Sequence, residues 1–196
     1  MTDHVGEMRI IEEPKKVLSM HPKKFAMWLF MASVLMLFAS ITSAYIVRQA
    51  EGNWLFFELP ALFAYSTAVI VISSLTIQLG YFAAKHDQFD KLQRMVSVTG
   101  VMGVVFLIMQ VIGWSQLVSQ SIYFVGNPSG SFVYVITGLH GAHIISALIF
   151  LLVVLRSASA QRINSGNMAQ MEMCVTYWHF LGILWVYLYG FLVLYR

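Results

Sequence analysis

The sequence predicts an all-α membrane protein, a polytopic bundle of five transmembrane helices with its N-terminus in the cytoplasm and its C-terminus outside. Of the 196 residues, 59% are hydrophobic and only 11% are charged, far from the balance of a soluble globular domain. The hydrophobic residues also form five blocks without an Asp, Glu, Lys or Arg in their interiors: residues 25–47, 60–84, 95–118, 132–155 and 174–195. Each block is long enough to cross a hydrocarbon core of about 30 Å.

The first block, residues 25–47, could be confused with a signal peptide, because "ITSAY" near its end offers a small-residue cleavage site. Its apolar run exceeds the roughly 7–15 residues of a signal-peptide core, and four further blocks follow. We therefore interpret it as a retained membrane anchor. Residues 1–24, which contain Pro14 and Pro22, are predicted to be a cytoplasmic N-terminal segment without a continuous helix.

The remaining blocks are separated by short connections that leave no room for a soluble domain, so residues 25–196 are predicted to form one membrane domain. The sequence contains no internal repeat, which disfavours a transporter built from inverted halves. Within the third block lies Gln110. A buried amide needs several hydrogen-bond partners, so we expect Gln110 to point into the bundle or towards a neighbouring subunit.

The distribution of cations predicts the orientation. If the blocks alternate in direction, ten cations lie on the side of the N-terminus: Arg9, Lys15, Lys16, Lys23, Lys24, Lys85, Lys91, Arg94, Arg156 and Arg162. Only Arg48 and Arg196 lie on the opposite side. Cytoplasmic loops carry the excess of Lys and Arg, so this distribution places the N-terminus in the cytoplasm.

Three histidines lie within the fourth and fifth blocks. The stretch "TGLHGAHIISA", residues 137–147, contains His140 and His143, and the fifth block contains His179. At 1.5 Å per residue, His140 and His143 lie roughly 12 and 16 Å below the outer surface, and His179 differs from His143 in depth by about 8–10 Å. One metal ion or one bis-histidine haem cannot easily use ligands at such different depths.

These histidines therefore have few chemical roles open to them within this chain. The blocks lack the carboxylates that proton pumps commonly use, which disfavours a proton relay. The single cysteine, Cys174, excludes an internal disulfide, and there is no C-x-x-C-H motif for covalent haem attachment. We expect neutral imidazoles that form hydrogen bonds across helix contacts, either within this chain or to a partner subunit, and we predict no catalytic, cofactor-binding or metal-binding residue.

The same two blocks carry a family resemblance. Residues 132–150, "FVYVITGLHGAHIISALIF", and residues 175–195, "VTYWHFLGILWVYLYGFLVLY", resemble the last two helices of subunit III of haem-copper oxidases, the cytochrome c oxidase type. The family pattern T-G-x-H-G-x-H is matched by Thr137, Gly138, His140, Gly141 and His143. The pattern Y-W-H-F, with a tryptophan six residues after its histidine, is matched by Tyr177, Trp178, His179, Phe180 and Trp185.

Two further segments support the resemblance. The opening pattern K-x-x-M-W-x-F-x-x-S-E of the family is matched by Lys24, Met27, Trp28, Phe30 and Ser33, and the pattern Q-x-x-E-[YW] by Gln110 and Trp114. The resemblance thus covers residues 24–196. Its five-span length corresponds to the short bacterial form, which lacks the first two helices of the seven-helix form and with them one wall of the family's lipid-holding cleft.

The chain departs from the family pattern at three acidic positions. Val34 stands where the membrane glutamate of the first pattern is expected, Gly113 replaces the acidic residue after Gln110, and Gly182 replaces an aspartate often found after the Y-W-H-F histidine. Family roles that depend on these carboxylates are not transferred to this chain.

The resemblance implies a non-catalytic subunit of a terminal oxidase in the bacterial cytoplasmic membrane. In the family, haems and copper belong to subunits I and II, whereas subunit III packs on subunit I, binds phospholipid, and supports proton uptake and lasting activity. The electron donor stays open between cytochrome c, quinol and an attached cytochrome complex. The alternatives are a subunit-III-like component of a quinol oxidase or nitric oxide reductase, an unrelated small membrane transporter or enzyme, and a membrane cytochrome.

Overall fold

Five long apolar helices make up the structure, a computed structural model that describes residues 22–161, 163 and 166–195. The helices are α1 (Pro22–Ala50), α2 (Leu62–Lys85), α3 (Phe89–Ser119), α4 (Pro128–Ser159) and α5 (Ala169–Leu194). Each is long and apolar enough to cross a membrane. The all-α class is therefore confirmed for the described residues, and the five long apolar helices are consistent with the five predicted spans. The predicted N-terminal segment, residues 1–24, lies outside the described residues except for its last three.

The helices extend beyond the predicted blocks by a few residues at most of their ends. α3 begins at Phe89, six residues before its apolar block, and so includes Asp90, Lys91 and Arg94. At the start of α4, Pro128 occupies the first turn and the Asn127 side chain accepts a hydrogen bond from the Ser129 amide at 3.0 Å. Hydropathy marks only the part in hydrocarbon, whereas helical hydrogen bonding continues into the polar region until a cap or turn stops it.

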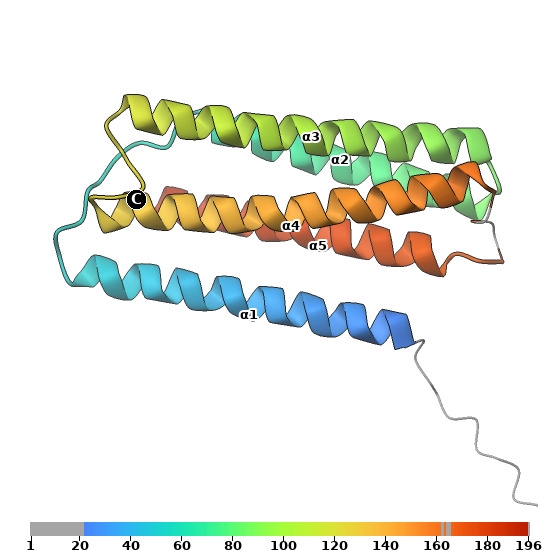
Figure 1. The fold of residues 1–196 in the computed structure, drawn as a ribbon, viewed down its shortest axis with the longest axis horizontal. Helices are drawn as coiled ribbons and strands as arrows, with labels where there is room; N and C mark the ends of the chain where they lie inside the picture. The colour runs from blue at the N-terminus through green and yellow to red at the C-terminus, as the bar shows by residue number, and fades with distance from the viewer. Residues whose placement is uncertain (1–21, 162, 164–165, 196) are drawn as a thin grey trace, which may run out of the picture.

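The five helices run side by side along one axis, and successive helices are antiparallel (Figure 1). α2 packs most extensively on α3, and both also pack on the pair formed by α4 and α5. Among the described residues, α1 contacts α4 and α5 but neither α2 nor α3. The arrangement is therefore a four-helix bundle, α2–α5, with α1 added along one side. Because the number of helices is odd and they alternate in direction, the described residues begin at Pro22 and end at Tyr195 at opposite ends of the bundle (Figure 1).

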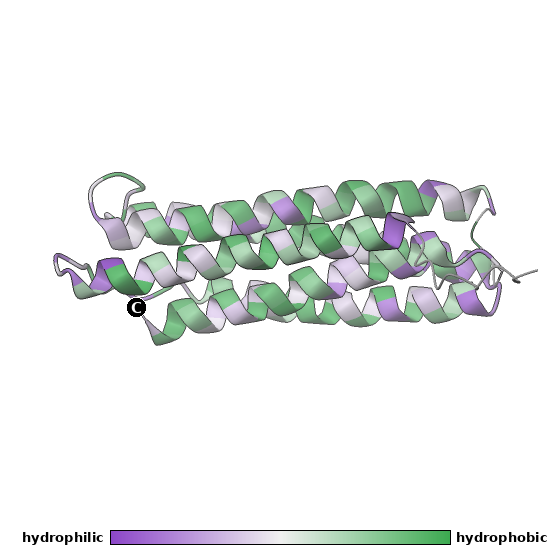
Figure 2. Ribbon diagram, turned by 90° about the horizontal axis from the view of Figure 1, so that it is seen from below, coloured by the Kyte–Doolittle hydropathy of each residue, from purple (hydrophilic) through white to green (hydrophobic). Residues whose placement is uncertain are grey.

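Large side chains fill the interior and also cover the exterior. Phe38, Phe106, Trp178 and Trp185 are fully or almost fully buried. On the outside, apolar side chains such as Met36 (73% exposed) and Val101 (63% exposed) face away from the bundle. Hydrophobic residues line the helices along most of their length, and hydrophilic residues gather towards their ends (Figure 2). Such a surface suits a lipid environment, in which apolar side chains need not be hidden.

Candidate functional site: the motif residues of α3, α4 and α5

The two motif tryptophans of α5 fasten this helix to α2. Trp178 and Trp185 are seven residues apart, so they lie on one face two turns apart. The Trp178 indole N–H donates to Ser73 Oγ at 3.0 Å, and that of Trp185 donates to Thr67 Oγ1 at 3.0 Å. In hydrocarbon an indole N–H has no water to bond, so each hydroxyl satisfies a group that would otherwise be left without a partner.

The motif residues of α3 also donate side-chain hydrogen bonds to its two neighbouring helices, α2 and α4. The Gln110 amide donates from Nε2 to Ser66 Oγ on α2 at 2.9 Å. One turn further on, the Trp114 indole N–H donates to Thr137 Oγ1 on α4 at 3.0 Å. Gln110 thus points into the bundle. Thr137, the first residue of the T-G-x-H-G-x-H pattern on α4, accepts the hydrogen bond from Trp114. Gln110 Oε1 has no hydrogen-bond partner within the described part of the chain.

His140 lies at the centre of the molecule in an aromatic environment. Its side chain is fully buried, and its ring centroid lies 4.9 Å from that of Trp185, 5.9 Å from Phe106 and 6.3 Å from Phe38. These contacts bring α1, α3 and α5 together around α4. Within the described residues neither ring nitrogen has a hydrogen-bond partner, which differs from our expectation of a bond across a helix contact. The aromatic neighbours leave no polar atom in reach.

His143 lies one turn further along α4, between α4 and α1. It is half-buried, its Nδ1 lies 2.7 Å from the Leu139 carbonyl oxygen of its own helix, and its ring lies 5.7 Å from that of Phe38. A carbonyl oxygen only accepts, so Nδ1 carries the proton and Nε2 remains an acceptor in the neutral ring. The bond across helices that we expected here is made nearby, where the Ser146 and Tyr177 hydroxyls hydrogen-bond at 2.7 Å.

His179 lies apart from the other two histidines, on the side of α5 that faces α2. Its Nε2 lies 3.1 Å from Gln78 Oε1, and the ring is half-buried. The three motif histidines therefore occupy three different environments. No group of three or more His, Cys, Asp or Glu side chains arranged to hold a metal occurs in the residues that the structure describes.

Two of the three positions that lack an expected carboxylate lie at tight helix contacts. A Cβ added to Gly113 would lie 2.9 Å from Phe63 Cε2, and one added to Gly182 would lie 3.1 Å from Ser74 Oγ. A longer acidic side chain does not fit at Gly113 without displacing the Phe63 ring. Val34, at the third position, is buried in the apolar core. Gly138 and Gly141 face Trp114 and Leu107 at ordinary contact distances.

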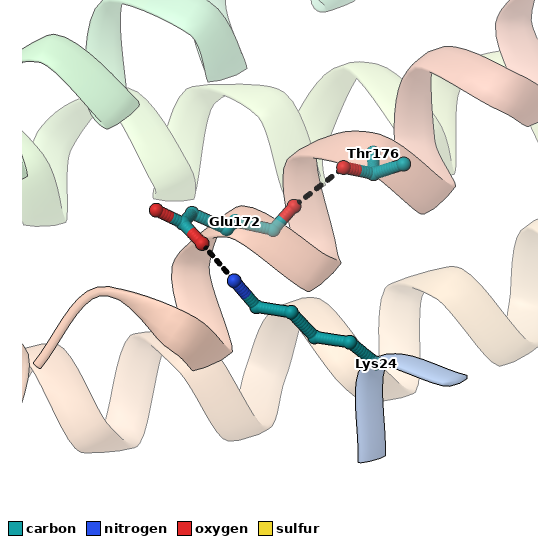
Figure 3. Close-up of polar contacts among 3 residues, drawn as sticks. All are labelled: Lys24, Glu172 and Thr176. Carbon is teal, nitrogen blue, oxygen red and sulfur yellow. Dashed lines mark hydrogen bonds and ion pairs between the residues drawn. The ribbon is translucent and has the colours of Figure 1, made fainter. Parts of the chain in front are cut away.

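The remaining motif residues lie on α1 and α5 in different surroundings. Phe180 is half-buried and borders a shallow apolar groove with Phe38 and Tyr187, whereas Trp28 is 55% exposed and points out of the bundle. At the N-terminal end of α1, the Lys24 ammonium forms an ion pair with the Glu172 carboxylate on α5 (Figure 3). The backbone carbonyl of Glu172 also accepts a hydrogen bond from Thr176 Oγ1 at 2.8 Å.

Sequence reasoning missed the partners of the motif residues. The acceptors on α2 are Ser66, Thr67 and Ser73, and a weak signal for them was present in "YSTAVIVISS", where hydroxyls recur seven residues apart. Glu172 was also missed, because it lies just outside the fifth apolar block. Neither signal predicts which motif residue the side chain contacts, because that prediction requires knowing which helices are neighbours.

Comparisons with known proteins match these residues to one family. A family model described as cytochrome c oxidase subunit III matches residues 53–196. This chain belongs to the cytochrome c oxidase subunit III family. A probable cytochrome c oxidase subunit 3 of Nocardia farcinica is 31% identical over 172 residues, which cover 83% of this chain and 82% of that protein. Cytochrome c oxidase subunit 3 of Bacillus sp. (strain PS3) is 26% identical, with 85% and 83% covered.

A third relative, the probable quinol oxidase subunit 3 of Staphylococcus saprophyticus, is 22% identical over 85% of both chains. This member of the cytochrome c oxidase subunit III family is accordingly subunit III of a haem-copper oxidase and associates with other oxidase subunits. It is a multi-pass protein of the bacterial cytoplasmic membrane. Members of the family lack metal centres of their own. Because the chain belongs to this family, the alternatives of an unrelated membrane transporter or enzyme and of a membrane cytochrome are set aside.

Proposed function

We propose that this chain is the auxiliary, non-catalytic subunit III of a terminal oxidase of the cytochrome c type in aerobic respiration. It packs directly on subunit I, binds phospholipid, and supports proton uptake and the lasting activity of the enzyme. The observation that carries the proposal is that the motif tryptophans form hydrogen bonds between helices. Trp114, Trp178 and Trp185 donate to hydroxyls on neighbouring helices, so they serve packing instead of chemistry.

The placement of acidic residues supports the same role. In the described helices, carboxylates occur only in the first turns of α3 and α5, at Asp90 and Glu172. The middle of the membrane therefore holds no acidic station of the kind on which proton-conducting proteins rely. In this proposal the haems, the copper and the proton path belong to subunits I and II, and the docked subunit III keeps proton supply to subunit I steady.

Oxygen consumption to exhaustion tests this role. We expect an oxidase prepared without this chain to keep its haem spectrum and its initial rate of oxygen uptake near neutral pH. It then loses activity over repeated turnovers sooner than the intact enzyme, and more so at alkaline pH, where proton supply limits the reaction. Equal lifetimes with and without the chain would contradict the supporting role, and an immediate loss of haem signal would contradict the non-catalytic one.

The proposed orientation places the N-terminus in the cytoplasm and the C-terminus outside. It rests on the ten cations at one end of alternating spans against two at the other. A reporter enzyme that is active only in the cytoplasm, fused after Arg196, is expected to be silent, and the same reporter fused within residues 86–88, between α2 and α3, is expected to be active. The reverse pattern would overturn the orientation.

Quinol is the second candidate electron donor for the complex, and one observation favours keeping it. A relative of similar coverage is a probable quinol oxidase subunit. Purification of the intact complex in a mild detergent, followed by identification of its chains, discriminates the two donors. A subunit II with a copper site and oxidation of cytochrome c support the first candidate. Oxidation of quinol alone supports the second.

A further inference from the structure

An apolar groove runs between α3 and α4 on the outside of the bundle. It has a volume of about 550 Å³ and lies along the first half of α3 and the last half of α4. Its lining is apolar except for one hydroxyl and consists of Ser97, Gly100, Val101, Val104, Val105, Leu148, Leu151, Leu152 and Leu155. At Gly100 an added Cβ would lie 3.1 Å from Leu151 Cδ2, so a side chain at this position would occupy part of the groove.

Two arginines flank one end of this groove. Arg94 lies one turn before Ser97 on α3, and Arg156 directly follows Leu155 on α4; both are exposed. Arg94 is five residues from the start of α3 and Arg156 three residues from the end of α4, so they lie at similar depths, about 7.5 and 4.5 Å from the helix ends.

The charges at this end of the groove sum to a positive value. Arg94 Nε donates to the Asp90 backbone carbonyl at 3.3 Å, which bends this side chain towards the helix end and the polar region. Exposed Lys91 and Asp90 lie in the same two turns of α3. With Arg94 and Arg156, and with Lys85 and Asp87 at the adjoining α2–α3 turn, the six groups carry four positive charges and two negative charges, a net charge of +2.

The combination of apolar groove and paired arginines fits one class of ligand. Guanidinium groups bind phosphate through two parallel hydrogen bonds, and basic pockets between transmembrane helices on the cytoplasmic side bind anionic lipid head groups. The open cleft at the opposite end, between α1 and α4, differs, because its Arg48 already pairs with Glu51 at 3.2 Å. We propose that the α3–α4 groove binds an anionic phospholipid of the cytoplasmic leaflet, with an acyl chain along the groove and the phosphate between Arg94 and Arg156. This inference rests on the phospholipid binding and orientation of the proposed function and names the lipid class and its site.

Lipid titration of the purified full-length chain tests the site. The delipidated chain in neutral detergent is titrated with phosphatidylglycerol or with phosphatidylethanolamine, and bound lipids are counted by native mass spectrometry. We expect phosphatidylglycerol to bind more tightly. The double variant Arg94→Gln, Arg156→Gln is expected to lose roughly tenfold in affinity for phosphatidylglycerol and to bind phosphatidylethanolamine as the wild type does.

Two further variants separate this site from general surface charge. Lys23→Gln with Lys85→Gln removes two exposed cations at the same end of the molecule, on helices that do not line the groove, and it is expected to leave binding unchanged. Val101→Trp, at a side chain that is 63% exposed, fills the groove from outside and is expected to weaken the binding of both lipids. Wild-type affinity of the arginine double variant for phosphatidylglycerol, or an equal loss in the lysine pair, would overturn the proposal. Because this titration needs no oxidase turnover, its outcome is independent of the lifetime experiment above.

Discussion

The bundle α2–α5 and the added helix α1 are held in different ways. Within the bundle, contacts run through the middle of the membrane. Trp178 donates to Ser73, and its ring reaches so far into α3 that a Cβ on Gly103 would lie 2.7 Å from it. In the described part of the chain, α1 packs on two helices only, and its polar side-chain contacts to the bundle lie towards its ends: the Lys24–Glu172 ion pair at one end, and Thr42 with Tyr187 and Tyr45 with Tyr195 towards the other. Tyr45 donates to the Tyr195 carbonyl at 3.2 Å and packs on the ring of Trp54 at 4.6 Å.

This difference teaches which part of the chain sets stability. Small residues such as Gly103 make room for large side chains of neighbouring helices. Such van der Waals packing is a main source of helix association in lipid, whereas terminal polar contacts near water contribute little. We therefore expect the bundle to behave as the cooperative unit and α1 to be the helix that separates first. Between its ends, α1 buries Val34 and Phe38 against the bundle, yet Leu35 and Met36 beside them face outwards.

The largest expected effect is at the bundle centre. Trp178→Ala removes a side chain that is 1% exposed and leaves Ser73 without its donor, so we expect a loss of about 3–5 kcal/mol in the free energy of unfolding. The measurement is unfolding in mixed micelles with increasing sodium dodecyl sulfate, followed by circular dichroism. Trp28→Ala, at a residue that is 55% exposed, is the matched control and is expected to change little.

Gly103→Ala is expected to rank second. The new methyl group would lie 2.7 Å from Trp178 Cη2 in the packed interior and 2.9 Å from Leu148 Cδ2, which borders the α3–α4 groove, and such overpacking costs about 1–3 kcal/mol. Gly190→Ala is the control, since a Cβ there meets nothing within 4 Å. The same unfolding assay should show Gly190→Ala unchanged or slightly more stable. An equal loss in both variants would mean that the α3–α5 contact is not the tight region.

The histidines provide a smaller and more discriminating test. His140 has no hydrogen bond to lose within the described structure, so His140→Leu is expected to keep the stability of the wild type or to exceed it. His179→Leu leaves Gln78 Oε1 without its donor, at a cost of about 0.6 kcal/mol. Haem content of the purified complex should be unchanged in both. Loss of haem in the His140→Leu complex, with all subunits present, would show a role beyond packing.

The smallest effect is expected at the end of α1. The Lys24 and Glu172 side chains are 35% and 37% exposed, so Lys24→Gln should cost no more than about 0–1 kcal/mol, and less at high salt. Its local effect is larger, because α1 loses one of its end contacts. Amide hydrogen exchange near the start of α1 is expected to speed up while exchange in α3 stays constant. Lys23→Gln, at the exposed residue beside Lys24, is the control, and equal exchange in both variants would show that the Lys24–Glu172 ion pair does not hold the start of α1.

The sequence by itself determined the helices and the residues that matter. Blocks without charges can only become helices across lipid, because every backbone group must be satisfied within its own segment. The motif residues also stood out, since Gln110, His140 and Trp178 are polar groups in apolar surroundings. These are local properties, and a chain read in order is sufficient to find them. The helix ends were less well predicted, because capping by Asn127 acts outside the apolar block.

Only the tertiary structure decided which groups meet. The Lys24–Glu172 pair joins residues 148 positions apart, and Trp178 and Ser73 are 105 apart. His140 shows most clearly that side-chain partners cannot be predicted from the sequence alone. Its polarity predicted a hydrogen bond, but the helices place it among Phe38, Phe106 and Trp185 instead. Helix identity follows from local hydropathy, whereas a partner depends on helix pairing, rotation and depth, which packing over the whole bundle sets together.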